Sequence, residues 1–223
     1  MNVAIRQGIG MTSQRTRNRL VARLIEQGIE DKRVLDVMGR VPRHLFVDEA
    51  LSSRAYEDTP LPIGHGQTIS QPFIVALMTQ ELLRGNAPRK VLEVGTGSGF
   101  QAAILSELVE TVYTVERIEP LHQLARERFK TLEKRNIFCK LSDGSWGWEA
   151  KGPFDAIMLT AAPSVVPPAL FDQLADGGRL IVPVGGEFGS QRLMLYTRTG
   201  DEIDERFLCD VHFVPLIGGG VAR

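Results

Sequence analysis

The chain has 223 residues and a formal net charge of −1, with 43% hydrophobic and 24% charged residues. These values exclude a disordered or fibrous chain, and the balanced charge argues against binding to a nucleic-acid backbone. The length allows one sizeable core, so we expect a single α/β domain with an appendage.

Three helices are predicted before residue 90. Apolar residues spaced i, i+1, i+4, i+5 predict an amphipathic helix over 12–28. Asp31 can cap a second, shorter helix, which Pro42 stops. Helical spacing resumes at Pro72, a favourable first-turn residue. The stretch IGHGQTISQP (63–72) follows neither helical nor strand spacing, so we expect a mobile loop there.

From residue 90 the sequence alternates strand and helix patterns. The predicted strands are KVLEV (90–94), VYTVE (112–116), IFCKL (137–141), FDAIMLT (154–160), RLIVPV (179–184), RLMLYTR (192–198) and VHFVPL (211–216). Helices fall between the first five, whereas the last two are expected to pair antiparallel at one edge. We therefore expect a Rossmann-like, doubly wound α/β fold with a seven-stranded, mostly parallel sheet and an antiparallel edge strand near the C-terminus. Residues 1–89 would form N-terminal helices and an acceptor or lid loop packed on a core of residues 90–223, within one structural domain.

A glycine-rich turn follows the first predicted strand. In VLEVGTGSGF, Gly95, Gly97 and Gly99 let a ligand approach the backbone, and the next helix offers unpaired N–H groups at its start. Glu116 ends the second strand, 21 positions after Gly95, where a carboxylate can accept both hydroxyls of a ribose. The two features together predict a nucleotide-type site.

The spacing of this turn favours one class of ligand. A dinucleotide site prefers G-x-G-x-x-G, whereas this chain has G-x-G-x-G with Glu93 two residues upstream. A carboxylate there repels a pyrophosphate and suits the ammonium and sulfonium groups of S-adenosylmethionine. LEVGTGSG with the strand-terminal acid resembles the first two motifs of the class I methyltransferases. In SDGSWG, Asp143 and Gly144 are the expected adenine contacts.

The methyl acceptor is constrained by what the sequence lacks. LTAAPSVVPP, after the fourth strand, is not the Asn/Asp-Pro-Pro-aromatic turn of many amine methyltransferases. The four histidines are scattered without matching acids, so no metal is expected, and His65 is the candidate general base in the right segment. A carboxylate acceptor fits, because an α-carboxyl titrates at about 3.5 and is already ionised. Gln67, Thr68 and Ser70 would then contact donor and acceptor.

Five stretches together resemble the protein-L-isoaspartate O-methyltransferase family: VPRHLFV, AYEDTPLPIGHGQTISQP, VLEVGTGSGFQAAIL, DGGRLIVPVG and FVPL. The resemblance runs from about Met11 to Leu216, and the glycine-rich tail after Leu216 departs from the pattern. It implies an enzyme that takes a methyl group from S-adenosyl-L-methionine, leaving S-adenosyl-L-homocysteine. The acceptor would be the α-carboxylate of isoaspartyl residues in damaged proteins and peptides, and the ester would collapse to a succinimide.

The resemblance also implies roles for individual residues. Ser70 is the residue that the family treats as catalytic, and we expect it to hold the acceptor by a hydrogen bond, because direct transfer needs no covalent intermediate. The implied cofactor-binding residues are Thr68, Ile69, Ser70, Glu93, Gly95, Thr96, Gly97, Ser98, Gly99, Glu116, Arg117, Asp143, Gly144 and Thr160. The implied substrate-binding residues are Ile63, Gly64, His65, Gly66, Gln67 and Val214.

Three other functions stay open on the residues alone. They are a class I methyltransferase of a small-molecule carboxylate, a non-catalytic S-adenosylmethionine-binding module, and a nicotinamide oxidoreductase, which Glu93 disfavours. Cys139 and Cys209 form no C-x-x-C pair, and no apolar run reaches the roughly 20 residues that span a bilayer. We therefore expect a cytoplasmic protein, monomeric or weakly dimeric, whose partners are isoaspartyl proteins rather than nucleic acid or membrane. Whether Met1 or Met11 starts the native chain stays open.

Overall fold

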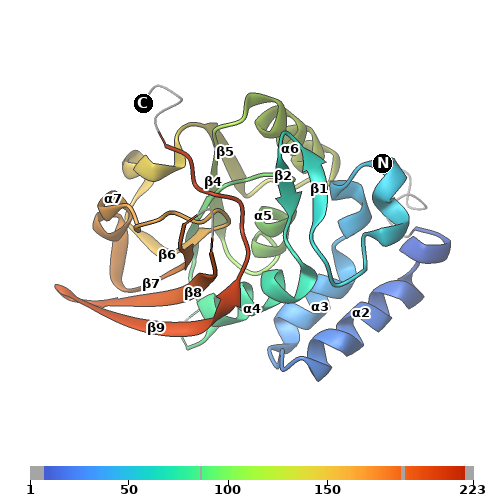
Figure 1. Ribbon diagram of the computed structural model, residues 1–223, viewed down its shortest axis with the longest axis horizontal. Coiled ribbons are helices and arrows are strands. Elements are labelled where there is room, and N and C mark those ends of the chain that lie inside the picture. Colours follow the sequence, from blue (N-terminus) through green and yellow to red (C-terminus); the bar gives the residue numbers. More distant parts are fainter. Residues whose placement is uncertain (1–7, 86, 187–188, 219–223) are drawn as a thin grey trace.

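The computed structural model describes residues 8–85, 87–186 and 189–218, and its centre is a seven-stranded sheet (Figure 1). The strands are β3 (Lys90–Val94), β4 (Thr111–Glu116), β5 (Ile137–Leu141), β6 (Phe154–Leu159), β7 (Leu174–Val184), β8 (Gln191–Thr199) and β9 (Glu202–Val211). Their order is β5-β4-β3-β6-β7-β8-β9, in which β5 to β7 run parallel and the β7–β8 and β8–β9 pairs are antiparallel. The predicted α/β fold with an antiparallel edge is confirmed.

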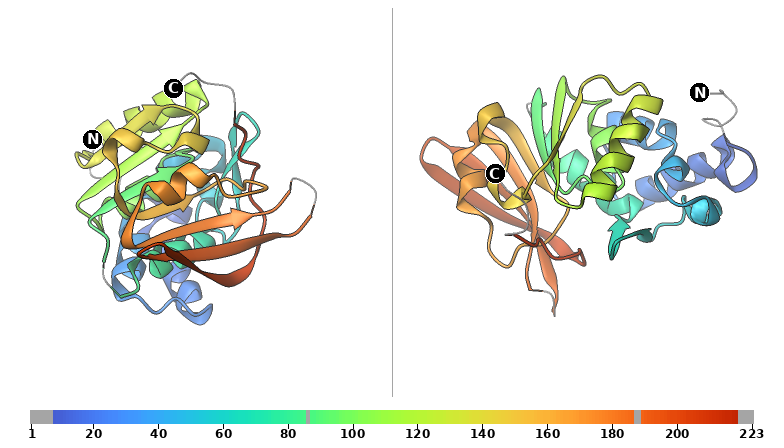
Figure 2. Two further views of the ribbon diagram at one scale, coloured as in Figure 1. Left: turned by 90° about the vertical axis from the view of Figure 1, so that its left-hand side faces the viewer. Right: turned by 90° about the horizontal axis from the view of Figure 1, so that it is seen from above.

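Helices cover both faces of this sheet (Figure 2). They are α4 (Pro72–Leu83), α5 (Phe100–Leu105), α6 (Glu119–Thr131) and α7 (Pro168–Asp172). Side chains of a strand alternate between faces, so Val91 clusters with α4, α5 and α6, whereas Leu92 clusters with Leu170 of α7. Between β5 and β6 the predicted helix is replaced by two 3₁₀ helices, η4 (Gly144–Trp146) and η5 (Glu149–Lys151).

Two helices, α2 (Gln14–Glu26) and α3 (Lys32–Arg40), form the appendage predicted ahead of the sheet. Asp31 caps α3 as predicted, because its side chain accepts hydrogen bonds from the N–H groups of Arg33 and Val34. Three 3₁₀ helices flank this pair, and they are η1 (Gly10–Thr12), η2 (Arg43–Phe46) and η3 (Glu49–Arg54).

The stretch IGHGQTISQP (63–72), for which the spacing predicts no regular structure, contributes to a β-hairpin. Its strands, β1 (Leu61–Gly64) and β2 (Gln67–Ile69), pair antiparallel. The two residues between them, His65 and Gly66, have positive φ values of 53° and 69°, as in a type I′ turn. Strands of four and three residues are too short for an alternating pattern to be recognised, which is why the hairpin was missed.

The C-terminal part of the sheet also differs from the prediction. VHFVPL (211–216) is not the seventh strand, because β9 ends at Val211 and the chain then runs across the carboxyl ends of the parallel strands (Figure 1). We call residues 213–217 the strap. The N–H of Ala162 donates to the carbonyl of Val214, and the N–H of Leu216 donates to the carbonyl of Ala162. The sequence of β9, EIDERFLCDV, contains many charged residues. Charged residues suit an exposed edge strand, but here they obscure the apolar residues by which a strand is recognised in a sequence.

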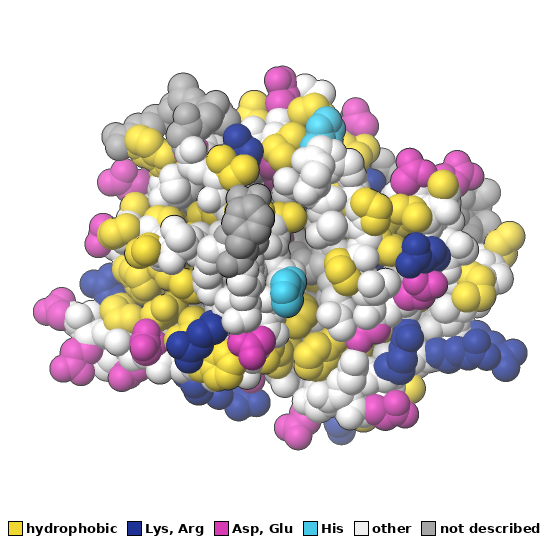
Figure 3. Space-filling view, in the orientation of Figure 1, with side chains coloured by type: hydrophobic (Ala, Val, Ile, Leu, Met, Phe, Trp, Pro, Cys, Tyr) yellow, Lys and Arg dark blue, Asp and Glu magenta, His cyan; other side chains and the backbone are white. Residues whose placement is uncertain are grey.

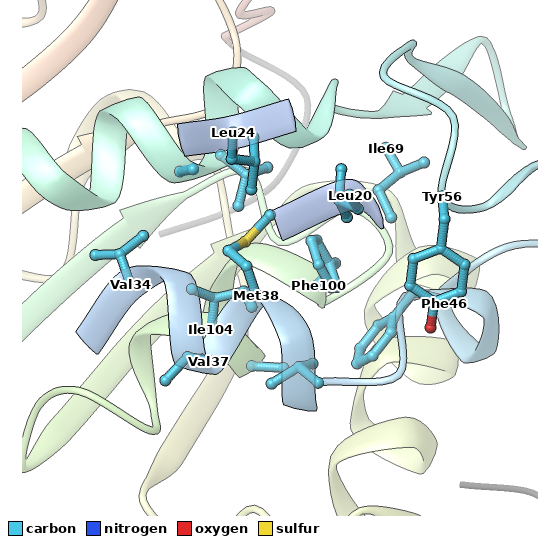
Figure 4. Close-up of a cluster of buried hydrophobic side chains, with 14 of the residues drawn as sticks. Leu20, Leu24, Val34, Val37, Met38, Phe46, Tyr56, Ile69, Phe100 and Ile104 are labelled. Atoms are coloured by element: carbon cyan, nitrogen blue, oxygen red, sulfur yellow. The ribbon is translucent and has the colours of Figure 1, made fainter. Parts of the chain in front are cut away.

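One hydrophobic cluster joins the appendage to the sheet domain (Figure 4). Leu24 of α2, Phe46 of η2, Ile69 of β2 and Phe100 of α5 all belong to it, and each is at most 3% exposed. The hairpin is therefore seated on the same core that supports the first helix after the glycine turn.

The surface carries both signs of charge. On the face shown in Figure 3, lysine and arginine side chains lie among aspartate and glutamate side chains, with hydrophobic side chains between them. Among the described residues, no helix combines the length and the apolar character needed to cross a lipid bilayer.

Candidate active site

A cavity lies at the carboxyl ends of β3, β4 and β6. From β3 the chain continues to β4, which lies next to β3 on one side, and it later returns to form β6, which lies next to β3 on the other side. Open α/β sheets bind ligands at such a topological switch point. The walls come mainly from residues 67–70 of the hairpin region, 93–98 of β3 and the glycine turn, 115–118 at the end of β4, 160–161 after β6, and 214–217 of the strap.

The glycine turn is required by backbone angle and by space. Gly95, Gly97 and Gly99 have φ values of 99°, 52° and 87°, a region that L side chains rarely adopt. A β-carbon on Gly95 would lie 2.5 Å from the hydroxyl oxygen of Thr160, and one on Gly99 would lie 2.8 Å from the ring of Phe129. The turn is thereby fixed between the end of β6 and helix α6.

Glu116, at the end of β4, is oriented by the glycine turn. Its Oε2 accepts a hydrogen bond from the N–H of Gly97 at 2.8 Å, and its Oε1 accepts one from the N–H of Ile118 at 2.9 Å. A carboxylate oxygen can accept more than one hydrogen bond, so both oxygens can also receive a hydroxyl. This geometry suits the two hydroxyls of a ribose.

Glu93 is completely buried and lines the inner wall of the cavity. Its Oε2 accepts from the hydroxyl of Thr114 at 2.5 Å, and Thr114 is linked at 2.6 Å to the hydroxyl of Thr96. Among the described residues Glu93 Oε1 has no hydrogen-bond partner, although the N–H of Ala102 is near enough to favour the ionised form. The pKa of Glu93 is raised to about 8, mainly by burial and in part by the negative charge of Glu116.

The buried environment of Glu93 contradicts the expectation from the sequence that this side chain carries a fixed negative charge. With a pKa of about 8, the side chain is mostly protonated at neutral pH, so it does not present the fixed negative charge expected to repel a pyrophosphate. A cationic hydrogen-bond donor beside Oε1 would favour ionisation and satisfy the unpartnered oxygen. An ammonium group fits this position.

Asp143 and Gly144 begin the turn after β5. The side chain of Asp143 caps η4, because its Oδ1 accepts from the N–H of Ser145 at 2.9 Å and from the hydroxyl of Ser145 at 2.8 Å. Gly144 lines the cavity, and a β-carbon there would collide with the side chain of Val94. Glycine at this position thus lets the backbone pack closely against Val94, whereas Asp143 lies just outside the lining.

Ser70 lies at the cavity wall between the hairpin and α4. Nη2 of Arg43 donates to the Ser70 carbonyl at 2.8 Å. Asp58 anchors the residues that follow, because it accepts from the N–H of Phe73 at 2.9 Å and from the side-chain amide of Gln71 at 3.1 Å. The backbone is therefore held at the Ser70 carbonyl and at the residues that follow it.

The cavity gathers most of the expected cofactor-binding residues. They are Thr68, Ile69, Ser70, Glu93, Gly95, Thr96, Gly97, Ser98, Glu116, Arg117, Gly144 and Thr160. Gly99 and Asp143 support the walls from outside the lining. Among the expected substrate-binding residues, Gln67 and Val214 line the cavity. Ile63, Gly64, His65 and Gly66 do not, and they form the end of the hairpin, where His65 is exposed.

The cavity also contains residues that the sequence did not indicate. They are Val75, Val94, Phe100, Gln101, Val115, Ile118, Ala161, Pro215, Leu216 and Ile217. Gln191, at the start of β8, was missed as a support of the strap. It is 3% exposed, its Nε2 donates to the carbonyl of Phe213 at 3.0 Å, and its Oε1 accepts from the N–H of Phe213 at 2.6 Å. A glutamine at the end of a strand is usually expected at the surface, so nothing in the sequence indicated this role for Gln191.

Comparison with known proteins agrees with this geometry. Residues 14–220 match the model of the family described as Protein-L-isoaspartate(D-aspartate) O-methyltransferase (PCMT). The chain is 61% identical over 213 residues to protein-L-isoaspartate O-methyltransferase 1 of Marinobacter nauticus, covering 96% of each chain. It is 60% identical over 211 residues to protein-L-isoaspartate O-methyltransferase of Hahella chejuensis, covering 95% of this chain and 100% of the relative.

Two solved structures share the fold over nearly the whole chain. One is a protein-L-isoaspartate O-methyltransferase with a TM-score of 0.83 and 28% identity, covering 92% of this chain and 66% of that chain. The other is a Plasmodium falciparum protein described as a protein-L-isoaspartate O-methyltransferase in complex with S-adenosyl-L-homocysteine. It has a TM-score of 0.79 and 30% identity, covering 90% of this chain and 98% of that chain.

Proposed function

This chain belongs to the protein-L-isoaspartate(D-aspartate) O-methyltransferase family, and from that premise we propose how its own residues carry out the reaction. The enzyme transfers a methyl group from S-adenosylmethionine to the α-carboxylate of L-isoaspartyl residues in damaged proteins and peptides. The methyl ester collapses to a succinimide, which makes the reaction a repair step.

We assign the cofactor contacts from the geometry of the cavity. Glu116 would accept the ribose hydroxyls, and Gly144, which lines the cavity, would contact the adenine. Glu93 Oε1 is a buried acceptor without a partner among the described residues, and it would receive the α-ammonium group. When bound, S-adenosylmethionine supplies a methyl group activated by the positive sulfonium. Gly95, Gly97 and the other wall residues exclude water around it.

The acceptor chemistry needs no general base. An α-carboxyl is ionised at neutral pH, so the task left to the protein is to align the acceptor and to exclude water. We assign to Ser70 the role of donating a hydrogen bond to the acceptor carboxylate, and Gln67 and Val214 line the same cavity. His65, which lies at the exposed end of the hairpin and outside the lining, is not needed as a base.

The remaining expectations are proposed on the same basis. Residues 8–89 contribute the hairpin and Ser70, and residues 90–218 contribute the cofactor walls, so we assign acceptor binding mainly to the first part. We propose that the protein works in the cytoplasm as a monomer or weak dimer, on proteins and peptides rather than on nucleic acid or membranes. The mixed surface charge supports this choice of partner.

The observation that carries the proposal is the joining of Ser70, Glu93 and Glu116 in one cavity. The test is methyl transfer from labelled S-adenosylmethionine to one synthetic peptide in two versions, with isoaspartate or aspartate at the same site. We expect base-labile label on the isoaspartyl peptide alone. Equal labelling of both peptides, or of neither while S-adenosylmethionine still binds, would contradict the proposed acceptor.

A further inference from the structure

Arg43 is a buried cation that the reaction chemistry above does not use. Its side chain is 0% exposed, and its guanidinium lies 4.9 Å from the centre of the Phe100 ring, beside the glycine turn. Burying an ionised group costs several kcal/mol unless it is well paired. Burial lowers the pKa of Arg43 to about 9, so the side chain still carries its charge at neutral pH.

The contacts of Arg43 are made mainly with backbone carbonyls. Nε donates to the carbonyl of Ala55 at 2.8 Å, and Nη2 donates to the carbonyl of Ser70 at 2.8 Å. Nη1 is buried and has no hydrogen-bond partner among the described residues. Tyr56 and Asp58 favour the charged form of Arg43 electrostatically, yet among the described residues no ion pair joins Asp58 to Arg43. Burial of this charge is unfavourable in free energy, and an apolar side chain in the same place would be less unfavourable.

The two carbonyls that Arg43 joins belong to different parts of the acceptor region. Ala55 follows η3 and precedes the hairpin, whereas Ser70 follows the hairpin. The planar guanidinium therefore joins the backbone before the hairpin to the backbone after it. Asp58 holds Gln71 and Phe73, but the hydrogen bond to the backbone of Ser70 itself comes from Arg43. A shift of Ser70 by a fraction of an ångström would move its hydroxyl relative to the methyl group.

We propose that Arg43 is a positioning residue for methyl transfer, which fixes the Ser70 backbone so that the Ser70 hydroxyl meets the acceptor carboxylate. The inference rests on the proposed role of Ser70. Arg43 does not touch the reacting atoms in this account and acts through Ser70.

The test is a double-mutant cycle between Arg43→Lys and Ser70→Ala, read with the isoaspartyl peptide. Lysine keeps the charge but cannot bond both carbonyls in the same fork. We expect Arg43→Lys alone to lower kcat/KM about 10- to 100-fold, while the Kd for S-adenosyl-L-homocysteine changes less than about threefold. In the Ser70→Ala background the same substitution should cost less than about threefold, because the hydroxyl it positions is absent.

Arg17→Met is the matched control for lost packing. Arg17 is a second buried arginine, 3% exposed, that donates to the carbonyl of Arg40 and packs on Tyr56 without lining the cavity. The Arg17→Met substitution should lower the Tm while leaving kcat/KM within about threefold of the wild type. If Arg43→Lys does not fold, Arg43→Gln, measured with bound S-adenosyl-L-homocysteine to confirm folding, takes its place in the cycle.

Each result has one meaning. An equal loss in both backgrounds, a loss confined to cofactor affinity, or no loss at all would overturn the role of Arg43. If Ser70→Ala alone keeps full kcat/KM, the proposed role of Ser70 fails, and this inference fails with it. The proposed isoaspartyl acceptor is tested separately, because the wild-type enzyme alone decides it with the two peptides.

Discussion

At the scale of single residues, the two carboxylates in the cavity are held in different ways. Each oxygen of Glu116 accepts a hydrogen bond from a backbone N–H, and these bonds fix the orientation of the carboxylate. Glu93 has one hydrogen bond, from Thr114, and is completely buried, so its pKa rises to about 8. Glu116 thus offers two oriented hydrogen-bond acceptors, whereas we expect Glu93 to ionise when a cation binds beside it.

Ser70→Ala tests the acceptor side of the cavity. Removal of one hydrogen bond to the acceptor should lower kcat/KM about 10- to 1000-fold, with little change in cofactor affinity. Ser106→Ala is the matched control, because that hydroxyl bonds to the carbonyl of Ala103 and Ser106 does not line the cavity. The measurement is steady-state methyl transfer, together with calorimetric binding of S-adenosyl-L-homocysteine. Normal turnover at saturating cofactor would exclude the proposed role of Ser70.

Glu93→Gln tests the cation-binding side. An ammonium beside Oε1 lowers the pKa of Glu93 from about 8, so cofactor binding should release a proton and should strengthen as the pH rises from about 6 to about 8. Titration calorimetry with S-adenosyl-L-homocysteine in two buffers of different ionisation enthalpy measures this release. The glutamine variant should release none and show a flat pH profile, and equal release by both proteins would rule Glu93 out as the source.

The same substitution has a predictable effect on stability without ligand. The pKa of Glu93 is raised from 4.5 to about 8 by folding, so the folded protein binds this proton more tightly than the unfolded chain. That contribution is complete below about pH 4.5 and is lost as the pH rises through about 8. The Tm of Glu93→Gln, relative to the wild type, should therefore increase between about pH 5 and pH 8.

At the scale of elements, the sequence predicted the long, apolar or well-capped segments and missed the short or polar ones. β3 and β5 have the predicted bounds because most residues in each strand are apolar, although β5 lies at the edge of the sheet and is only partly buried. The hairpin was missed because its strands are short, and β9 because its charges lie at an exposed edge. The glycine motif supplies a run of cavity residues, 93–98, that are neighbours in sequence, whereas the strap and Gln191 are brought to the site by contacts between residues far apart in sequence.

Gln191→Leu tests whether the strap must be held. Leucine fills similar space but removes both hydrogen bonds to Phe213, which should cost about 1–3 kcal/mol and raise the KM for the peptide several-fold. Gln80→Leu is the control, since this buried glutamine accepts from the N–H groups of Glu30 and Asp31 and does not line the cavity. Peptide KM and Tm are measured for both. A similar rise in KM in both variants would show a general loss of stability instead.

At the scale of the whole molecule, acceptor and cofactor segments share one core. The cluster that contains Leu24 of α2 also contains Ile69 of the hairpin and Phe100 of α5, so it crosses the boundary near residue 89 (Figure 4). Domains that fold alone have separate cores, whereas parts joined by a common core unfold together. We therefore expect the appendage and the sheet domain to unfold as one cooperative unit, so that a destabilising change in α2 lowers the Tm of the whole molecule.

Leu24→Ala separates these two possibilities, because both tryptophans, Trp146 and Trp148, lie on the sheet side of the chain. Leu24 is 0% exposed, so its truncation should cost about 2–5 kcal/mol. In a single cooperative unit, tryptophan fluorescence and far-ultraviolet circular dichroism should show the same lowered Tm. Ile25→Ala, one position along and 55% exposed in the wild type, should leave both curves nearly unchanged. If the Tm from circular dichroism falls while the Tm from tryptophan fluorescence does not change, the appendage unfolds separately from the sheet domain. That result would contradict the single cooperative unit.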